Sequence, residues 1–197
     1  MSSTQRRSLK TKMVVGMLTF AAVLTGVTAI VSSVTSCASV PDDKRFTAMI
    51  GPNYPAFRDS VDPYIEKQCG TLDCHGEPGR GFRVYGFRGL RLYSQEAGLI
   101  PGVQQTTPDE VNANYFALIS VEPETFNRVM AQNGQNADQL LFMRKAMNLE
   151  RHKGGALFAK DSAPYRCITA WLRLLPDPQA TLGTTDQAFC DKAKTQP

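Results

Sequence analysis

Two thiols and an imidazole lie within seven residues, in the segment Cys69-Gly70-Thr71-Leu72-Asp73-Cys74-His75. Such thiols can oxidise to a disulfide, or they can bind a metal together with the imidazole. A thioredoxin-like redox pair uses Cys-x-x-Cys in a βαβ setting, and the segment has neither feature. A tetrahedral zinc site needs four ligands, and few candidates lie nearby. A disulfide beside an uninvolved histidine and a zinc site both stay open as interpretations.

The adjacency of Cys74 and His75 is typical of a third chemistry, the covalent attachment of haem. Two thiols add to the vinyl groups of the porphyrin, and the imidazole after the second thiol binds the iron. The common spacing is Cys-x-x-Cys-His, whereas here four residues separate the thiols, and Gly70 eases the additional loop. The segment Cys69–Gly76 resembles the expanded haem motif of some cytochromes c, notably exported myxobacterial cytochrome-like lipoproteins. The resemblance implies one covalent haem c held by Cys69 and Cys74, with His75 as the proximal ligand.

The second of the chain's two histidines is His152. The stretch from Leu140 to Leu175 resembles a pattern in bacterial cytochrome-c-like domains. In this pattern a lysine-containing segment leads to His-x-Gly-Gly, which is followed by Phe, an acid or Ser, Tyr and a Trp-Leu helix. The matching residues are Lys145, His152-Lys153-Gly154-Gly155, Phe158, Asp161, Tyr165 and Trp171-Leu172. The resemblance implies that His152 is the distal axial ligand. The alternative is a histidine in a surface loop before a Gly-Gly turn.

Methionines are the rival candidates for the distal position. Met143 and Met147 lie four residues apart and therefore on one face of a helix, although such a pair more often belongs to a core. A methionine ligand would give a higher reduction potential than a second histidine. A cluster of arginines after the motif offers partners for the propionates of the haem, at Arg80, Arg83, Arg88 and Arg91.

The N-terminal segment has the layout of an export signal. Residues 1–12 are polar and basic, and residues 13–34 are apolar without a charge. The following Val34-Thr35-Ser36-Cys37 resembles the bacterial lipobox, which implies cleavage before Cys37 and a lipid on its thiol. We therefore expect a signal peptide over 1–36 and a lipidated tether over 37–57. An uncleaved membrane anchor is the alternative, because 22 apolar residues suffice to span a bilayer.

The remaining chain has no electrostatic preference for nucleic acid. The net charge of +4 comes from four basic residues before residue 13, and no acid precedes Asp42. The segment after the signal is therefore neutral overall, and we expect no nucleic-acid partner. With 42% hydrophobic and 20% charged residues, the composition also excludes a disordered, collagen-like or polytopic membrane protein.

The two remaining cysteines, Cys167 and Cys190, have no role in the haem motif. An oxidising compartment would let them form a disulfide across 23 residues. The alternative is a pair of free buried thiols. We predict the disulfide, because the export signal places the chain outside the cytoplasm.

Apolar periodicity and capping signals predict a mainly α, cytochrome c-like domain with long loops over 58–197. Thr107, followed by Pro108 and Glu110, is a strong helix start. We also expect a small β-hairpin from the alternation at 83–85 and 90–93. The predicted helices are 59–68, 107–120, 123–132, 137–148, 163–175 and 186–192.

These features together predict a membrane-anchored, monohaem c-type cytochrome that transfers electrons outside the cytoplasm. It would lie in the cell envelope, on the periplasmic side of a membrane or at the cell surface, and exchange electrons with a redox protein. No nucleophile–base pair is evident, so we expect an electron carrier rather than a catalyst. The alternatives are a haem-based peroxide-handling enzyme or gas sensor, and a haem-free, disulfide-bonded binding lipoprotein.

Overall fold

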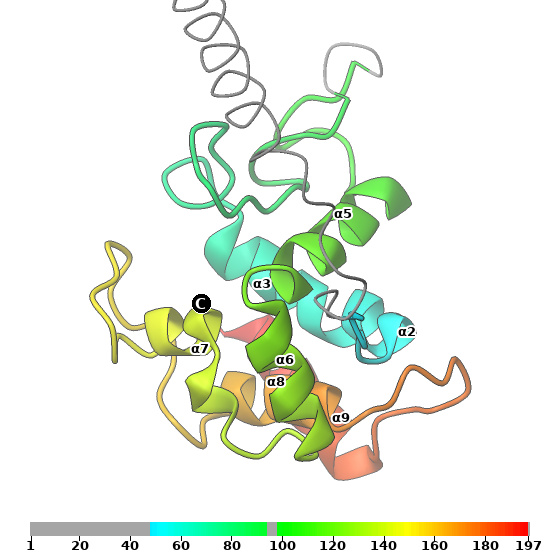
Figure 1. Cartoon of the computed structure of the whole chain (residues 1–197). Helices are drawn as coiled ribbons and strands as arrows, with labels where there is room; N and C mark the ends of the chain where they lie inside the picture. Colours follow the sequence, from blue (N-terminus) through cyan, green and yellow to red (C-terminus); the bar gives the residue numbers. More distant parts are fainter. Residues whose placement is uncertain (1–47, 94–97, 197) are drawn as a thin grey trace, which may run out of the picture. The chain divides into compact units, whose positions relative to one another are not determined.

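The computed structural model describes residues 48–93 and 98–196 (Figure 1). The regular secondary structure of these residues consists of short helices. The predicted signal, Cys37 and most of the tether lie outside these residues. None of the described helices has the length and apolar character required to cross a bilayer. In chain order the helices are α2 (Tyr54–Ala56), η3 (Phe57–Val61), α3 (Asp62–Cys69), α5 (Pro108–Ile119), α6 (Pro123–Ala131), η4 (Ala137–Gln139), α7 (Leu141–Ala146), α8 (Ala163–Leu172) and α9 (Thr184–Thr195).

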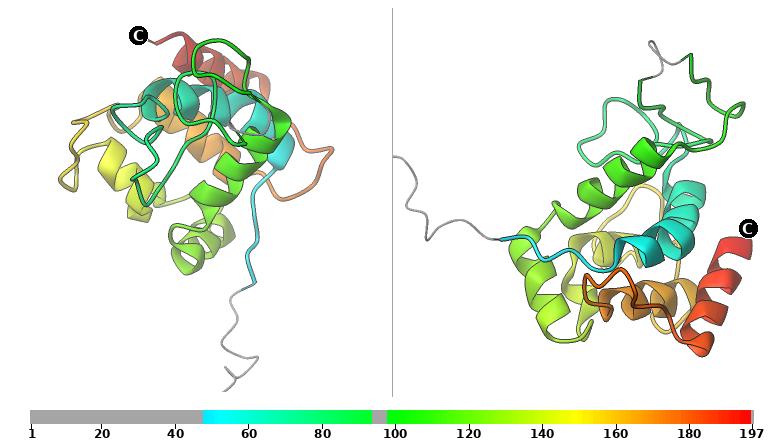
Figure 2. Two further views of the ribbon diagram at one scale, coloured as in Figure 1. Left: turned by 90° about the horizontal axis from the view of Figure 1, so that it is seen from above. Right: turned by 90° about the vertical axis from the view of Figure 1, so that its right-hand side faces the viewer.

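The core forms where α8 packs against α9 and against the helical stretch from α2 to α3 (Figure 2). Trp171 on α8 is fully buried, and its ring lies 5.3 Å from that of Phe57 and 6.0 Å from that of Phe126. These aromatic residues join three segments that are distant in the sequence. The prediction of a mainly α structure is therefore confirmed.

The packed region begins earlier than the expected boundary between tether and domain at 57/58. Asn53 is buried, and its Oδ1 accepts a hydrogen bond of 2.7 Å from the Ala56 backbone N–H, which caps α2. The Asn53 carbonyl oxygen accepts a bond of 2.9 Å from Trp171 Nε1. These bonds tie residues 53–57 to the core, so the tether prediction was wrong at its C-terminal end.

The predicted helix at Thr107 is confirmed, and its cap also organises the long segment before it. The Thr107 side chain accepts from the Glu110 N–H, and the Glu110 carboxylate accepts from the Thr107 N–H, which forms a capping box. Glu110 also binds Arg91 through two hydrogen bonds of 2.8 and 2.9 Å, with both side chains fully buried. Two further bonds run from Arg91 to the carbonyl oxygens of Gln104 and Gln105. The Arg91–Glu110 ion pair and the bonds from Arg91 therefore hold together the two ends of the segment that runs from Arg91 to Thr107.

The prediction of a β-hairpin at 83–85 and 90–93 is wrong. The described residues contain no strand there, only an isolated bridge between Tyr85 and Leu90. The backbone N–H and carbonyl of Tyr85 are both bonded to the Asn114 side chain, at 2.7 and 2.8 Å. A side chain of α5 thus satisfies the groups that a partner strand would have used.

The helix predicted over 137–148 is divided in two. Leu140 has an extended backbone, with ψ of 133°, and separates η4 from α7. The Leu141 N–H at the start of α7 donates to the Glu122 carboxylate. This distant side chain satisfies a backbone group that an uninterrupted helix would have satisfied itself.

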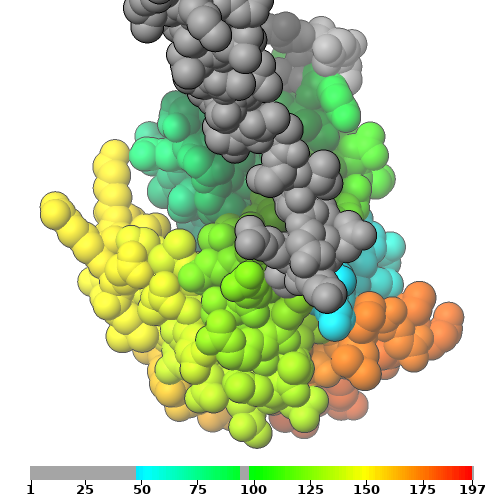
Figure 3. Space-filling view, viewed as in Figure 1, coloured from blue at the N-terminus to red at the C-terminus, as the bar shows by residue number. Residues whose placement is uncertain are grey.

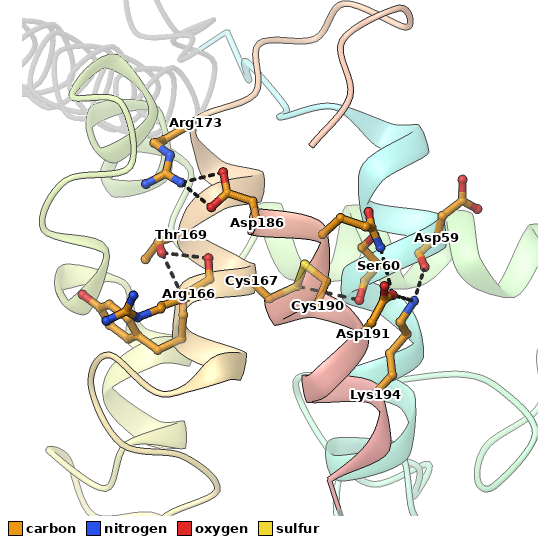
Figure 4. The surroundings of a disulfide bond; sticks show 12 residues. Asp59, Ser60, Arg166, Cys167, Thr169, Arg173, Asp186, Cys190, Asp191 and Lys194 are labelled. Atoms are coloured by element: carbon orange, nitrogen blue, oxygen red, sulfur yellow. Dashed lines mark hydrogen bonds and ion pairs between the residues drawn. A yellow bond between two sulfur atoms is a disulfide. The ribbon is translucent and has the colours of Figure 1, made fainter. Parts of the chain in front are cut away.

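The predicted disulfide between Cys167 and Cys190 is present and joins α8 to α9 (Figure 4). The bond is buried where η3 meets the two helices, and Cys167 Sγ lies 3.9 Å from the Ser60 carbonyl oxygen. Arg173, the C-cap residue of α8, pairs with Asp186 of α9 at 3.0 Å. α9 is longer than the predicted 186–192.

Asp62, at the start of α3, gives the domain a pH dependence. It is buried and accepts a 3.0 Å hydrogen bond from Asn114 Nδ2. Burial raises the pKa of its carboxyl to about 7, whereas an unfolded Asp has a pKa of about 3.9. Between these values the native state retains a proton that the unfolded state has lost. The contribution of Asp62 to stability therefore falls as the pH rises from about 4 to about 7.

Replacing Asp62 with asparagine is expected to remove this slope, because the amide keeps the shape without the ionisation. The unfolding free energy of D62N minus that of the wild type should rise by up to about 4 kcal/mol between about pH 4 and about pH 7. Urea denaturation at several pH values measures this difference. A difference that stays constant with pH would rule out Asp62 as the source.

Candidate functional site

The two thiols of the motif lie at the end of α3 and in the turn that follows it. Cys69 is the last residue of α3, with Gly70 as its C-cap. The His75 N–H donates to the Cys69 carbonyl oxygen at 2.8 Å, and the Cys74 N–H donates to that of Thr71 at 2.9 Å. These bonds fold the four intervening residues into a compact turn, which places His75 next to the helix end.

Glycine is required directly after His75 by the close approach of two backbone segments. A Cβ on Gly76 would overlap the carbonyl oxygen of Gly70 and crowd the Cα of Gly89. A side chain at position 76 would therefore force the turn away from the 83–90 segment, which packs on it.

The ring of His75 is oriented by the loop that follows the motif. Its Nδ1 lies 2.9 Å from the Phe82 carbonyl oxygen, and the Phe82 ring meets the imidazole edge-on at 4.9 Å. A carbonyl oxygen can only accept, so Nδ1 carries the hydrogen and Nε2 has a free lone pair. Burial lowers the pKa of His75, which favours the neutral ring that a metal requires.

His152 is oriented in the same way by a tight turn. Its Nδ1 lies 3.0 Å from the Gly155 carbonyl oxygen, and the Gly155 N–H donates to the His152 carbonyl oxygen at 3.1 Å. Gly155 has φ of +70°, which glycine adopts without strain. Because a carbonyl oxygen can only accept, the hydrogen lies on Nδ1, and this tautomer leaves the lone pair of Nε2 free.

The structure brings the two histidines together although 76 residues separate them in the sequence. Their ring centres lie 6.2 Å apart and their planes differ by 11°. The pairing joins the loop after α3 to the loop after α7. These are the two segments that the motifs singled out.

A mostly apolar cavity of about 310 Å³ lies between these loops, within the size range of small-molecule sites. In Figure 3 the segment around 150–157, in yellow, projects from the surface beside the segment around 70–85, in blue-green. The walls come from α3, α5, α7, α8 and the two histidine loops. They comprise Tyr64, Ile65, Gln68, Cys69, Cys74, His75, Phe82, Leu118, Val121, Leu141, Phe142, Lys145, Ala146, Arg151, His152, Lys153, Gly154, Leu157, Phe158 and Ile168.

Cys69 and Cys74 both border the cavity as free thiols. Burial, with a smaller effect from Cys74, raises the pKa of Cys69 to about 12. The thiol of Cys69 is therefore protonated at neutral pH and is a poor thiolate ligand. Among the described residues no group of three or more Cys, His, Asp and Glu is arranged to hold a metal ion, so the tetrahedral zinc interpretation gains no support.

Tyr64 contributes an unsatisfied hydroxyl to the wall. Its side chain is 2% exposed, borders the cavity, and packs against Phe158 with ring centres 6.2 Å apart. Within the described residues its Oη is buried without a hydrogen-bond partner. A buried hydroxyl in this state costs free energy, and an occupant of the cavity or a water molecule could satisfy it.

The rival methionines lie elsewhere. Met143 is fully buried in the core, Met147 is 9% exposed, and neither borders the cavity. α7 turns Leu141, Phe142 and Lys145 toward the cavity instead. The geometry therefore favours His152 over both methionines as the group opposite His75.

Two of the arginines expected near the site already have partners within the protein. Arg91 is buried against Glu110, and Arg80 Nε donates to the Cys74 carbonyl oxygen at 3.1 Å and lies 3.4 Å from Glu77. Of the three described cations that border the cavity, Lys145 lies on α7, and Arg151 and Lys153 lie on the other histidine loop. Because Arg151 and Lys153 flank the candidate ligand His152 in the sequence, their place beside the site could have been predicted, but the motifs assign them no role.

Comparison with known proteins identifies no relative. The chain matches no protein-family model, and neither a curated protein nor a solved structure is detectably similar to it.

Proposed function

We propose that the protein is a monohaem c-type cytochrome that transfers electrons outside the cytoplasm. Cys69 and Cys74 would hold the haem covalently, and His75 and His152 would be its axial ligands. A lipid on Cys37 would tether the domain to a membrane, on the periplasmic side or at the cell surface. The helical domain would then be cytochrome c-like, with a redox protein as its partner.

The pair formed by His75 and His152 is the observation that carries this proposal. A metal–imidazole bond is about 2 Å long and the ring centre lies about 1 Å beyond the nitrogen, so two imidazoles on opposite sides of one metal have centres about 6 Å apart. The observed 6.2 Å fits this value. Both rings also donate from Nδ1 to a backbone carbonyl, the arrangement that usually orients histidine ligands.

The two thiols fit covalent attachment. Each free thiol would add across one vinyl C=C, with a new C–S bond to sulfur and the thiol hydrogen transferred to the other vinyl carbon. This addition balances without an oxidant or a reductant. It needs two free thiols, and Cys69 and Cys74 are not joined to each other. Both also border the cavity in which a porphyrin would lie.

When bound, a haem supplies an iron that gains and loses one electron. The chain's contribution is a fixed environment for that exchange. His75 and His152 are held by backbone hydrogen bonds, and apolar side chains such as Phe142 and Leu157 would keep water from the cavity. Two imidazole ligands favour a lower potential than an imidazole with a thioether, because the thioether stabilises the reduced iron.

His152 also distinguishes an electron carrier from a gas sensor or peroxide-handling enzyme. Those functions require an open position opposite His75, and His152 lies at that position in this proposal. An electron carrier needs no exchangeable ligand, so we favour this function over the haem alternatives. The free thiols likewise give no support to a haem-free protein with a Cys69–Cys74 disulfide.

Spectroscopy of the protein produced with a haem-ligation system tests this function. The reduced protein is expected to be low-spin and unchanged by carbon monoxide. The oxidised protein should give a rhombic low-spin electron paramagnetic resonance signal, as parallel axial imidazole planes do. Rapid formation of a carbon monoxide adduct by the wild type would instead support a sensor or an enzyme.

A further inference from the structure

The charged side chains that border the cavity are all basic. Lys145, Arg151 and Lys153 border it, and no Asp or Glu is among the described residues that do so. The rest of the wall is mostly apolar. This combination suits an amphiphilic occupant with an apolar body and anionic groups at one edge.

Of these three cations, Arg151 and Lys153 have no side-chain partner in the described part of the chain. Lys145 Nζ is already bound, at 2.8 Å to a Glu150 carboxylate oxygen and at 2.9 Å to the Arg151 carbonyl oxygen. The side chains of Arg151 and Lys153 are exposed and make no ion pair or hydrogen bond with residues 48–93 or 98–196. An exposed cation is ordinary, but these two flank His152 at the opening of an apolar cavity.

The same loop would therefore bring an axial ligand and two charges to one occupant. The turn closed by Gly155 fixes His152, so residues 151 and 153 are held on either side of it. The guanidinium of Arg151 can bind a carboxylate through two parallel hydrogen bonds, and the ammonium of Lys153 adds a point charge.

We propose that Arg151 and Lys153 form a carboxylate-binding site at the mouth of the cavity and bind the propionates of the porphyrin. The inference rests on the proposed function and assigns to these residues the role that the sequence had suggested for the cluster of Arg80, Arg83, Arg88 and Arg91. The two charges would favour ionised propionates. They would thereby set the pH range in which proton uptake accompanies reduction.

The test measures the midpoint potential against pH, at low ionic strength, for the wild type and two doubly substituted variants. R151Q/K153Q removes both charges from the mouth. R58Q/K192Q removes one arginine and one lysine charge from exposed positions that do not border the cavity. In R151Q/K153Q the redox-linked ionisation should move to higher pH by about 0.7 unit, which corresponds to a loss of about 1 kcal/mol. In R58Q/K192Q it should stay at the wild-type pH.

Equal shifts in both variants would overturn the proposal, because the effect would then be one of net charge. An unchanged profile in R151Q/K153Q would also overturn it. If this variant yields no haem protein, R151Q and K153Q are measured singly against the same criterion. A colourless wild type is a separate outcome, which removes the proposed function itself.

Discussion

Replacing His152 with alanine is expected to open the iron to carbon monoxide. In the wild type both imidazoles would occupy the axial positions, so the reduced protein should ignore the gas. In H152A the group opposite His75 is lost, and Met143 and Met147 lie in the core away from the cavity. The adduct should therefore form in nearly all of the reduced H152A protein. Absorption spectra recorded before and after addition of the gas measure this change.

The matched control for H152A is M147L, a volume-conserving substitution in the core. Met147 was one of the two alternative ligands in the sequence, and it does not border the cavity. M147L should keep the low-spin spectrum and stay insensitive to carbon monoxide. A low-spin, insensitive H152A together with a reactive M147L would transfer the distal role to the methionine.

Replacing Glu110 with glutamine is expected to destabilise the domain by about 3 to 5 kcal/mol, because it leaves a buried arginine without its counter-charge. Both side chains of the Arg91–Glu110 pair are fully buried. Although burial alone would raise the pKa of Glu110, the hydrogen bonds from Arg91 and from the Thr107 and Leu92 N–H groups hold it below its usual range. Glu110 therefore remains ionised at neutral pH. Urea denaturation of E110Q at neutral pH measures the loss.

The neighbouring exposed Asp109 provides the control for E110Q. It lies in the same first turn of α5, so D109N tests the loss of a carboxylate near the helix start without the buried pair. Its expected cost is below about 1 kcal/mol. Similar losses in E110Q and D109N would mean that the buried pair adds nothing beyond a helix-end charge.

Local signals predicted the elements that local interactions determine. Thr107, Pro108 and Glu110 lie within one helical turn, and their capping box starts α5 as expected. The expectation of export to an oxidising compartment led us to pair Cys167 with Cys190, and this disulfide is confirmed.

The failures occur where a distant residue decides the local structure. Asn114, almost thirty residues away, binds both backbone groups of Tyr85 and replaces the expected hairpin. The Glu122 carboxylate accepts from the Leu141 N–H and helps to divide the predicted helix. No periodicity within 83–93 or 137–148 encodes these partners.

The candidate site could be predicted in part. The sequence identified Cys69, Cys74, His75 and His152, and the structure places all four around one cavity. It assigned no role to Tyr64 or Arg151, because membership of a cavity wall depends on how α3 and the loop after α7 pack. No spacing of residues in the sequence indicates how these segments pack against each other.

The intact mass of the purified protein, produced in a host that matures c-type cytochromes, tests the central claim most directly. We predict a mass greater than that of the polypeptide by one haem, with Cys69 and Cys74 both resistant to alkylation after denaturation. A colourless protein with the mass of the polypeptide alone, whose two thiols are alkylated or joined to each other, would contradict the account.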